Sequence, residues 1–286
     1  MDLEKYKNIK NIYRFFSQDD YNLTGLASQY LWFSKVDAFN DPFENEIIRG
    51  DFDFSNLSKE VLVNFFKTNE TITFGDPTSD DSFRAKAKDI DLERLLEEKY
   101  DEIIPKVNDI VLEHARSLQS KYFHCLSHDQ GDVHPLENRL LWSHYASGLR
   151  GFVIEFNLDV ILNSINNINS DKFIGCGLIS YIEHNYDEFI KGKILKEESL
   201  DINDMLFNKH PDWEYESEIR LISDAEKLFY HPESISRIIV GDKMAAENRE
   251  HIYRIALSKG IESKLYVATI DRGNFTINVT KGLYKN

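Results

Sequence analysis

The sequence has few cysteines and no long apolar run. Its 286 residues include only Cys125 and Cys176, too few for a disulfide framework or an iron–sulfur site. No stretch of about 18 uncharged apolar residues is present, as a membrane-spanning helix would need. The N-terminal stretch MDLEKYKNIKNIYRFF lacks the apolar core of a signal peptide. We therefore expect a cytoplasmic protein with no membrane partner.

Basic residues are outnumbered by acidic ones, 34 Lys and Arg against 49 Asp and Glu. The formal net charge is −15, and the acidic residues are spread along the chain rather than gathered in a tail. Binding to a nucleic-acid backbone without regard to sequence needs many Lys and Arg contacts. A general nucleic-acid binder is therefore not expected. A deep local pocket could still hold a single nucleotide with one or two arginines.

The familiar catalytic motifs are absent. The chain contains no G-x-x-x-x-G-K-[ST], G-x-G-x-x-G, H-E-x-x-H or G-x-S-x-G, which excludes P-loop, dinucleotide-fold, zincin and α/β-hydrolase interpretations. The segment FHCLSHDQGDVHP holds three histidines and Cys125. Adjacent residues of a strand, such as His124 and Cys125, point to opposite faces and cannot readily share one ion. No metal is expected.

The patterns that are present indicate an α+β fold. With 42% hydrophobic residues the chain can bury a substantial core. Strand-like runs dominate after residue 120, which favours a mixed or mostly antiparallel sheet. Helical spacing over about 55–120 predicts a helical insertion within one domain spanning 1–286.

The predicted elements can be placed by residue range. Strands are predicted at Tyr13–Phe16, Tyr30–Phe33, Tyr122–Ser127, Gly151–Phe156, Gly177–Ile182, Glu216–Ile222, Ile235–Gly241, Ser263–Thr269 and Phe275–Val279. Helices are predicted near Leu23–Gln29, Leu140–Ala146, Val160–Ile165 and Ala245–Ser258.

The run WEYESEIRLI, from Trp213 to Ile222, carries most of the chemical information. Alternation at period two predicts a strand with Glu214, Glu216, Glu218 and Arg220 on one face. Carboxylates two apart on a strand lie about 7 Å from each other, so their pKa values should rise unless cations offset the repulsion. This row is either a catalytic acid/base platform or the solvated outer face of an amphipathic strand.

A second distinctive segment is LLWSHYASGLRGFVIEF, from Leu140 to Phe156. His144 and Tyr145 lie on its predicted helix, before a glycine-bounded turn into an apolar strand. Both side chains can donate hydrogen bonds to a ring or a phosphate. Alternatively, they tie the helix to the sheet.

Several short motifs together resemble a known family. YRF, LWFS, FNDPFE, LWSHYA, GFVIEF and WEYESEIRLI resemble, in the same order, a widespread bacterial family catalogued as a domain of unknown function. The likeness covers almost the whole chain. The name of that family implies no activity.

The same residues bear a weaker resemblance to ADP-ribosyltransferases, which implies an ADP-ribosyltransferase-like split sheet. Those enzymes carry an Arg or His on a first strand, a Ser or Tyr on a second, and a Glu on a late strand. The corresponding residues here are Arg14, Ser34 and Glu218, with Glu216 as the preceding acid. Ser34 stands in WFSK rather than in the usual Ser-Thr-Ser run. The resemblance implies that Arg14, Ser34 and Glu218 converge on one cleft.

The resemblance also implies roles in NAD binding and cleavage. Arg14, beside Tyr13, would bind the NAD pyrophosphate or adenosine side. Glu218 would stabilise the oxocarbenium-like ribose, and Glu216 would activate the nucleophile. Trp32 or Tyr145 would stack on a ring of NAD.

The loop FNDPFE adds two further candidates. Asn40 and Asp41 would cap the following element or face the ribose. Trp32 has a packing alternative in the core, and Arg14 has one as an ion pair with Asp41 or Glu44.

Taken together, these resemblances imply transfer of ADP-ribose from NAD to a macromolecular acceptor, either protein or nucleic acid. Use as a toxin or anti-phage effector, with a possible antitoxin partner, is part of that expectation. NAD glycohydrolase activity is an alternative. A catalytically silent ligand-sensing or partner-binding module is another, for which the glutamate row should be exposed and distant from Arg14.

Overall fold

The computed structural model describes residues 8–41, 58–60, 63, 67, 71–74, 83–101, 120–183 and 206–282. The chain divides into two compact units. The first comprises Met1–Ala38, Lys121–Tyr181 and Lys209–Asn286, and the second comprises Phe39–Ser120 and Ile182–Asn208. The segment predicted as a helical insertion falls in the second unit, which also takes in Ile182–Asn208.

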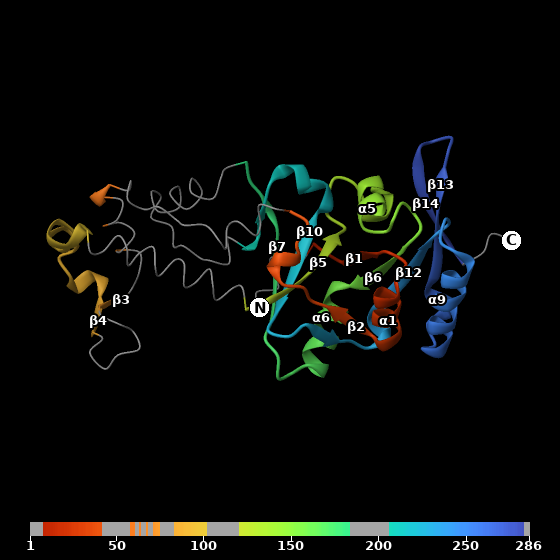
Figure 1. The fold of residues 1–286 in the computed structure, drawn as a ribbon, viewed down its shortest axis with the longest axis horizontal. Coiled ribbons are helices and arrows are strands. Elements are labelled where there is room, and N and C mark those ends of the chain that lie inside the picture. Colours follow the sequence, from red (N-terminus) through yellow and green to blue (C-terminus); the bar gives the residue numbers. More distant parts are fainter. Residues whose placement is uncertain are drawn as a thin grey trace. The chain divides into compact units, whose positions relative to one another are not determined.

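The first unit is α+β and is built on an eight-stranded sheet (Figure 1). The strand order is β14-β13-β12-β6-β1-β5-β10-β7, and only β12 and β13 run parallel. The strands of this sheet are β1 (Asn11–Phe16), β5 (Tyr122–His128), β6 (Phe152–Asn157), β7 (Ile174–Leu178), β10 (Glu218–Ser223), β12 (Ile235–Gly241), β13 (Leu265–Asp271) and β14 (Thr276–Lys281).

Shorter elements complete the first unit. β2 (Tyr30–Trp32) pairs with β11 (Lys227–Phe229) in a two-stranded ribbon. The helices are α1 (Asp20–Ser28), α5 (Arg139–His144), α6 (Leu158–Ile168) and α9 (Ala246–Ser258), with 3-10 turns η2 (Val36–Ala38), η4 (Pro135–Glu137), η5 (Pro211–Glu216), η6 (Pro232–Ser234) and η7 (Glu262–Lys264). Two very short strands, β8 (Ser180–Tyr181) and β9 (Asn208–Lys209), also occur.

Side-chain caps fix where the helices begin. Asp19 accepts a hydrogen bond from the Asn22 amide at the start of α1, and Asn157 accepts one from the Val160 amide at the start of α6. Gln29 ends α1 in the left-handed conformation, with φ of 56°. The chain can therefore turn sharply from α1 into β2.

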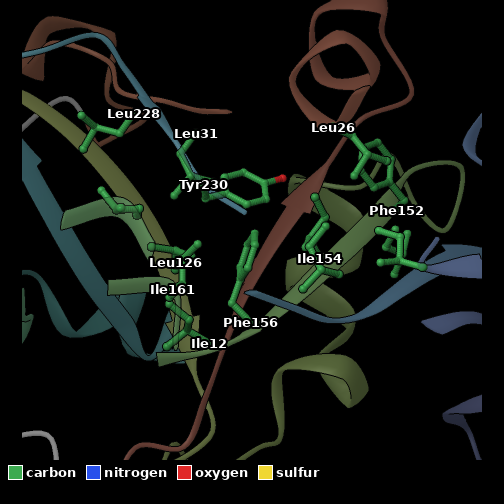
Figure 2. Close-up of a cluster of buried hydrophobic side chains, with 14 of the residues drawn as sticks. Ile12, Leu26, Leu31, Leu126, Phe152, Ile154, Phe156, Ile161, Leu228 and Tyr230 are labelled. Atoms are coloured by element: carbon green, nitrogen blue, oxygen red, sulfur yellow. The ribbon is translucent and has the colours of Figure 1, made fainter. Parts of the chain in front are cut away.

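The two faces of the sheet are covered by different helices. On one face, apolar residues of α1, α6 and α9 pack against alternate residues of the central strands. Figure 2 shows Ile12, Leu126, Ile154 and Phe156 from the strands beneath this layer. The opposite face is covered by α5 and η4 through a smaller cluster that includes Trp142.

The second unit is described only in part. β3 (Thr71–Phe74) and β4 (Phe83–Lys86) form an antiparallel hairpin, followed by the 3-10 turn η3 (Ala87–Asp89). Residues 92–101 are helical, with Leu92 and Leu96 buried. The predicted helical pattern is thus present over 92–101 but gives way to a hairpin before it, and 102–119 lie outside the described residues.

Two predicted strands need correction. The strand expected from Glu216 begins only at Glu218, because Pro211–Glu216 form the 3-10 turn η5. The strand expected at Gly177–Ile182 is β7, which begins earlier at Ile174, followed by the short β8. Period-two alternation is a weak guide where a 3-10 turn runs into a strand.

Candidate functional site

A left-handed residue brings Glu216 and Glu218 together. Ser217 lies between η5 and β10 with φ of 43°, and its carbonyl accepts the His128 amide at 2.8 Å. This turn directs both carboxylates to the same lysine, although Glu216 is not part of the strand. Ser217 also touches the preceding loop closely, since a Cβ on Gly131 would lie 1.9 Å from its Oγ.

Lys209 lies between the two carboxylates. Its Nζ donates to Glu216 Oε2 at 2.7 Å and to Glu218 Oε2 at 3.2 Å. Arg220 donates from Nε and Nη2 to Glu218 Oε1, each at 2.8 Å. All four side chains are buried, so the solvated outer face considered for the predicted row is wrong for Glu216, Glu218 and Arg220. Glu214, the first residue of that row, is exposed and does not join the cluster.

The electrostatics of this cluster keep Glu218 ionised. Burial alone would raise the pKa of Glu218, but the charges of Arg220 and Lys209 outweigh burial and lower it well below its usual value. A hydrogen bond from Cys125 acts in the same direction. Two buried cations therefore balance the two carboxylates, as buried charges require.

Aromatic side chains connect the cluster to the surface. The Tyr145 hydroxyl donates to Glu216 Oε1, and the ring of Trp213 lies under Lys209, with its centroid 4.6 Å from Nζ. The exposed His144 lies 3.0 Å from the Tyr215 hydroxyl through Nδ1. Tyr145, Trp213 and Tyr215 are all half-buried, so the cluster approaches solvent on this side.

Asn138 joins these aromatic residues to α5. Its Oδ1 accepts from the amides of Leu140 and Leu141 and so caps the helix, while its Nδ2 donates to the Tyr215 carbonyl at 2.8 Å. Trp142 anchors the same helix by donating from Nε1 to the Leu136 carbonyl. The relative placement of α5 and η5 is therefore fixed by buried hydrogen bonds.

A polar row crosses the sheet on the same face. Directly paired residues of adjacent strands share a face, and the pairs Glu155–Tyr13, Tyr13–Ser127 and Ser127–Glu218 run across four strands. Tyr13 Oη lies 3.2 Å from His134 Nε2. Burial, and next the negative charge of Glu155, raise the pKa of Tyr13.

Arg14 lies on the opposite face of the sheet. Its neighbours Tyr13 and Phe15 belong to the cluster under α5, whereas Ile12 belongs to the core on the other side. Arg14 points to the side of Ile12 and packs against the Phe16 ring, 5.7 Å from its centroid. The structure therefore does not bring Arg14 and Glu218 together on one face.

On its own face Arg14 lies where β1 and β5 are no longer paired. Its Nη1 donates to the Cys125 carbonyl at 2.7 Å, past Tyr13–Ser127, the last pair that joins β1 to β5. His124 lies on this face too, with Nδ1 2.7 Å from the Trp32 carbonyl. Burial, and next the charge of Arg14, lower the pKa of His124 to about 3.

The other predicted residues are more dispersed. Ser34 pairs with Phe123, and Glu218 pairs with Ser127 of the same strand, so both lie on one face of the sheet. Phe123 and Ser127 are four residues apart, which displaces Ser34 from Glu218 by about 13 Å along β5. Trp32 is 48% exposed, which excludes the alternative that it is a core residue. Asn40 and the buried Asp41 belong to the second unit, and the rest of FNDPFE lies outside the described residues.

Lys209 is the residue that sequence reasoning missed. It is separated from the glutamates by Pro211 and a 3-10 turn, so no helical or strand spacing links them. The available signal was indirect, because two acids on a buried strand need a cation.

Comparison with known proteins gives one match. A family model described as a protein of unknown function (DUF2971) matches residues 141–221, which include most of α5 and both Glu216 and Glu218. This supports similarity to a domain-of-unknown-function family. No curated protein and no solved structure matches the chain.

The described part of the chain contains no group of three or more His, Cys, Asp or Glu side chains placed to hold a metal ion. Nor does any helix within it have both the length and the apolar character needed to cross a membrane.

Proposed function

We propose that the protein is an ADP-ribosyltransferase-like enzyme that cleaves the nicotinamide–ribose bond of NAD. The observation that carries this proposal is the pair Glu216 and Glu218, held by one lysine on a sheet face beside Tyr145. An ionised carboxylate stabilises the positive charge that develops on ribose when nicotinamide leaves. The lowered pKa of Glu218 keeps that charge in place over a wide pH range.

The two acids are assigned different tasks. Glu218 would accept a hydrogen bond from a ribose hydroxyl and stabilise the oxocarbenium-like state. Glu216 would act as general base toward the nucleophile, because its Oε1 faces the half-buried Tyr145 at the solvent side of the cluster, where an acceptor could approach. Tyr145 and His144 would contact NAD at the surface end of the cluster.

We assign the first-strand position of this site to Tyr13 rather than Arg14. Tyr13 lies in the same cross-strand row as Glu218, whereas Arg14 lies on the other face. Arg14 is therefore expected to stabilise the sheet through its contacts with Cys125 and Phe16, and not to contact NAD. Ser34 is on the correct face but distant, so its contact with NAD would be at the far end of the ligand.

Transfer to a macromolecular acceptor and hydrolysis of NAD are two outcomes of the same cleavage. A protein or nucleic-acid acceptor makes the protein a transferase, with a toxin or defence role and an antitoxin partner as further proposals. Water as the acceptor makes it an NAD glycohydrolase. The two are separated by labelled NAD, which marks a macromolecule in cell lysate only if transfer occurs.

The test is nicotinamide release from NAD. We expect Glu218→Gln to lower the rate about 100-fold or more, the usual loss when one stabilising group for transition-state charge is removed. Glu155→Gln is the matched control, since Glu155 is a buried, arginine-paired glutamate of the same face. Equal losses in both variants, with equal losses of folded protein, would reject the catalytic role of Glu218.

A binding module without catalysis is the second candidate. The specific observation in its favour is the charge balance of the cluster, in which Lys209 and Arg220 already pair with both glutamates. In that case NAD is not cleaved by the wild type, in the presence or absence of lysate. The cluster then serves to fix η5 against β10.

A further inference from the structure

The outer face of the β2–β11 ribbon carries three aromatic rings around one lysine. The register places Lys227 opposite Trp32, and Phe229 opposite Tyr30. Lys227 Nζ lies 4.9 Å from the Tyr30 ring centroid and 5.4 Å from that of Trp32. Tyr30 and Phe229 meet edge to face, with centroids 6.0 Å apart.

These rings are open to solvent although the ribbon itself is anchored in the core. Trp32 is 48% and Phe229 45% exposed. The alternate residues Leu31 and Leu228 are buried, and Figure 2 shows them directed into the same cluster as Tyr230. The ribbon therefore has one side that stabilises the fold and one side that presents aromatic surface.

Hydrogen bonds hold both strands of the ribbon in place. Asn169 donates from Nδ2 to the Phe229 carbonyl at 2.9 Å and accepts the Phe229 amide at 3.1 Å. The Trp32 carbonyl is bonded to the buried His124 ring. The exposed rings are consequently preorganised, and a ligand would order little of the backbone on binding.

Lysine–aromatic pairs recur on the segments joined to this ribbon. Ser34 connects the end of β2 to β5 through its pairing with Phe123. Next to that contact, Lys35 lies over the Tyr122 ring at 5.5 Å, and Lys121 lies over the Phe173 ring at 5.0 Å. Phe173 is 53% exposed.

Among the described residues, Lys35, Lys121 and Lys227 have no carboxylate within ion-pair distance. Exposed acids such as Asp37 and Glu226 nevertheless lie nearby in the chain. The nearby Asp171 pairs with Lys172, and Asp224 accepts the Phe173 amide. Three ammonium groups therefore remain available to an anionic partner.

We propose that this aromatic–lysine surface binds single-stranded nucleic acid. Exposed rings offer faces on which unpaired bases stack, and neighbouring lysines offer charges for the phosphates between them. The net charge of −15 opposes general duplex binding, so affinity must come mainly from stacking. This inference does not rest on NAD cleavage, although under that proposal it would make a nucleic acid the acceptor.

The test is fluorescence anisotropy of a labelled single-stranded oligonucleotide of mixed sequence, measured without NAD. We expect a Kd of about 1–100 µM and little binding to the matching duplex. Each phosphate neutralised on a single strand contributes about −0.7 to the slope of log affinity against log salt concentration. About three such contacts should therefore give a slope of about −2. A DNA and an RNA version separate the two chemical forms.

Matched variants locate the binding surface. Trp32→Ala should weaken binding about fivefold or more, the loss expected for one stacked base, and Phe229→Ala should do the same. Lys227→Gln should reduce the salt slope by about 0.7. Phe275→Ala is the control, because Phe275 is 77% exposed in the connection between β13 and β14.

Tryptophan fluorescence gives a second readout. Of the three tryptophans, Trp142 is buried and the half-buried Trp213 packs against Lys209 in the cluster of Glu216 and Glu218, so base stacking on the aromatic–lysine surface should quench chiefly Trp32. Trp32→Phe should keep the affinity but lose most of the quenching, whereas Trp32→Ala should lose both. No binding by the wild type, or equal losses in Phe275→Ala and Trp32→Ala, would overturn the proposal. Concentration-dependent dimers broken by Trp32→Ala, without oligonucleotide binding, would likewise overturn it and assign the surface to self-association.

Discussion

The two faces of the eight-stranded sheet use buried residues in different ways. The face under α1, α6 and α9 is mainly apolar, with its strand residues and helices forming one large cluster, and carries Arg14 and His124 beside that cluster. The face under α5 combines a smaller apolar cluster with the polar row from Glu155 to Glu218. In Figure 1, α5 and α6 lie on opposite sides of the central strands.

The two faces are therefore expected to contribute differently to the stability of the fold. Burying apolar side chains is favourable in itself, at about 25 cal/mol per Å². Burying ion pairs is at best weakly favourable, and the same residues replaced by well-packed apolar groups are often as stable. The apolar face can therefore account for the fold, while the cluster of Lys209 and the two glutamates calls for a functional explanation.

The largest expected effect is on the apolar face. Phe156 is fully buried there and meets Tyr230 edge to face, with centroids 5.3 Å apart. Phe156→Ala should lower the free energy of unfolding by about 3–5 kcal/mol, as large-to-small changes in cores do. Urea denaturation measures this loss. Val160→Ala, at a 45% exposed position of α6, should change it by about 0.5 kcal/mol or less.

On the polar face, the largest effect should come from removing Lys209. Lys209→Met leaves two buried carboxylates facing each other, at a cost of about 3 kcal/mol. Adding Glu216→Gln removes the carboxylate left without a cation, since Arg220 still pairs with Glu218, and should recover part of that loss. Denaturation of the single and double variants measures both changes. A double variant less stable than Lys209→Met would contradict the ion-pair account.

Acid should destabilise the two faces in different pH windows. His124, on the apolar face, has its pKa lowered from 6.5 to about 3, so the unfolded chain takes up a proton first. Its contribution to stability is therefore complete above about pH 6.5 and lost as the pH falls toward 3, by up to about 1.4 kcal/mol per pH unit. His128 adds to this slope, because burial also lowers its pKa.

Glu218, on the polar face, titrates lower. Its pKa is lowered from 4.5, so its contribution is present above pH 4.5 and lost only on further acidification. When the free energy of unfolding is measured from pH 7 to 3, that of His124→Gln should fall less steeply between pH 6.5 and 4.5 than that of the wild type. Glu218→Gln should change the slope only below that range. A reversed assignment of the two windows would contradict the electrostatic account.

The smallest effect is expected at Tyr13. Tyr13→Phe removes only the hydroxyl that contacts His134, and should lower the free energy of unfolding by about 1 kcal/mol. The ring contact with His134, with centroids 5.3 Å apart, should persist and serve as the internal control in a structure of the variant. If Tyr13 faces NAD, Tyr13→Phe should weaken the free energy of NAD binding by more than it lowers the free energy of unfolding.

Most elements of the first unit could be predicted from sequence, because their patterns are strong. The predicted strand Ile235–Gly241 has the bounds of β12, and the predicted helix Ala245–Ser258 differs from α9 by one residue. Each has a run of apolar or β-branched residues with a clear period. The α+β class with a mostly antiparallel sheet is confirmed on the same basis.

The site was harder to predict, because it depends on where each strand begins and which face it presents. Period two correctly grouped Glu218 with Arg220, but Glu216 joins them only through the left-handed Ser217. Family resemblance drew attention to Arg14, although a shift of one residue along β1 moves a side chain to the other face. Register, which a single sequence does not show, places Tyr13 rather than Arg14 on the face of Glu218.

The most direct test is the position of NAD in a crystal structure of Glu218→Gln with NAD bound. This variant should retain the ligand while cleavage is blocked. The account predicts the nicotinamide ribose beside residue 218 and Tyr145, on the face of Tyr13. NAD bound against Arg14 on the opposite face, or a wild-type protein that neither binds nor cleaves NAD, would contradict it.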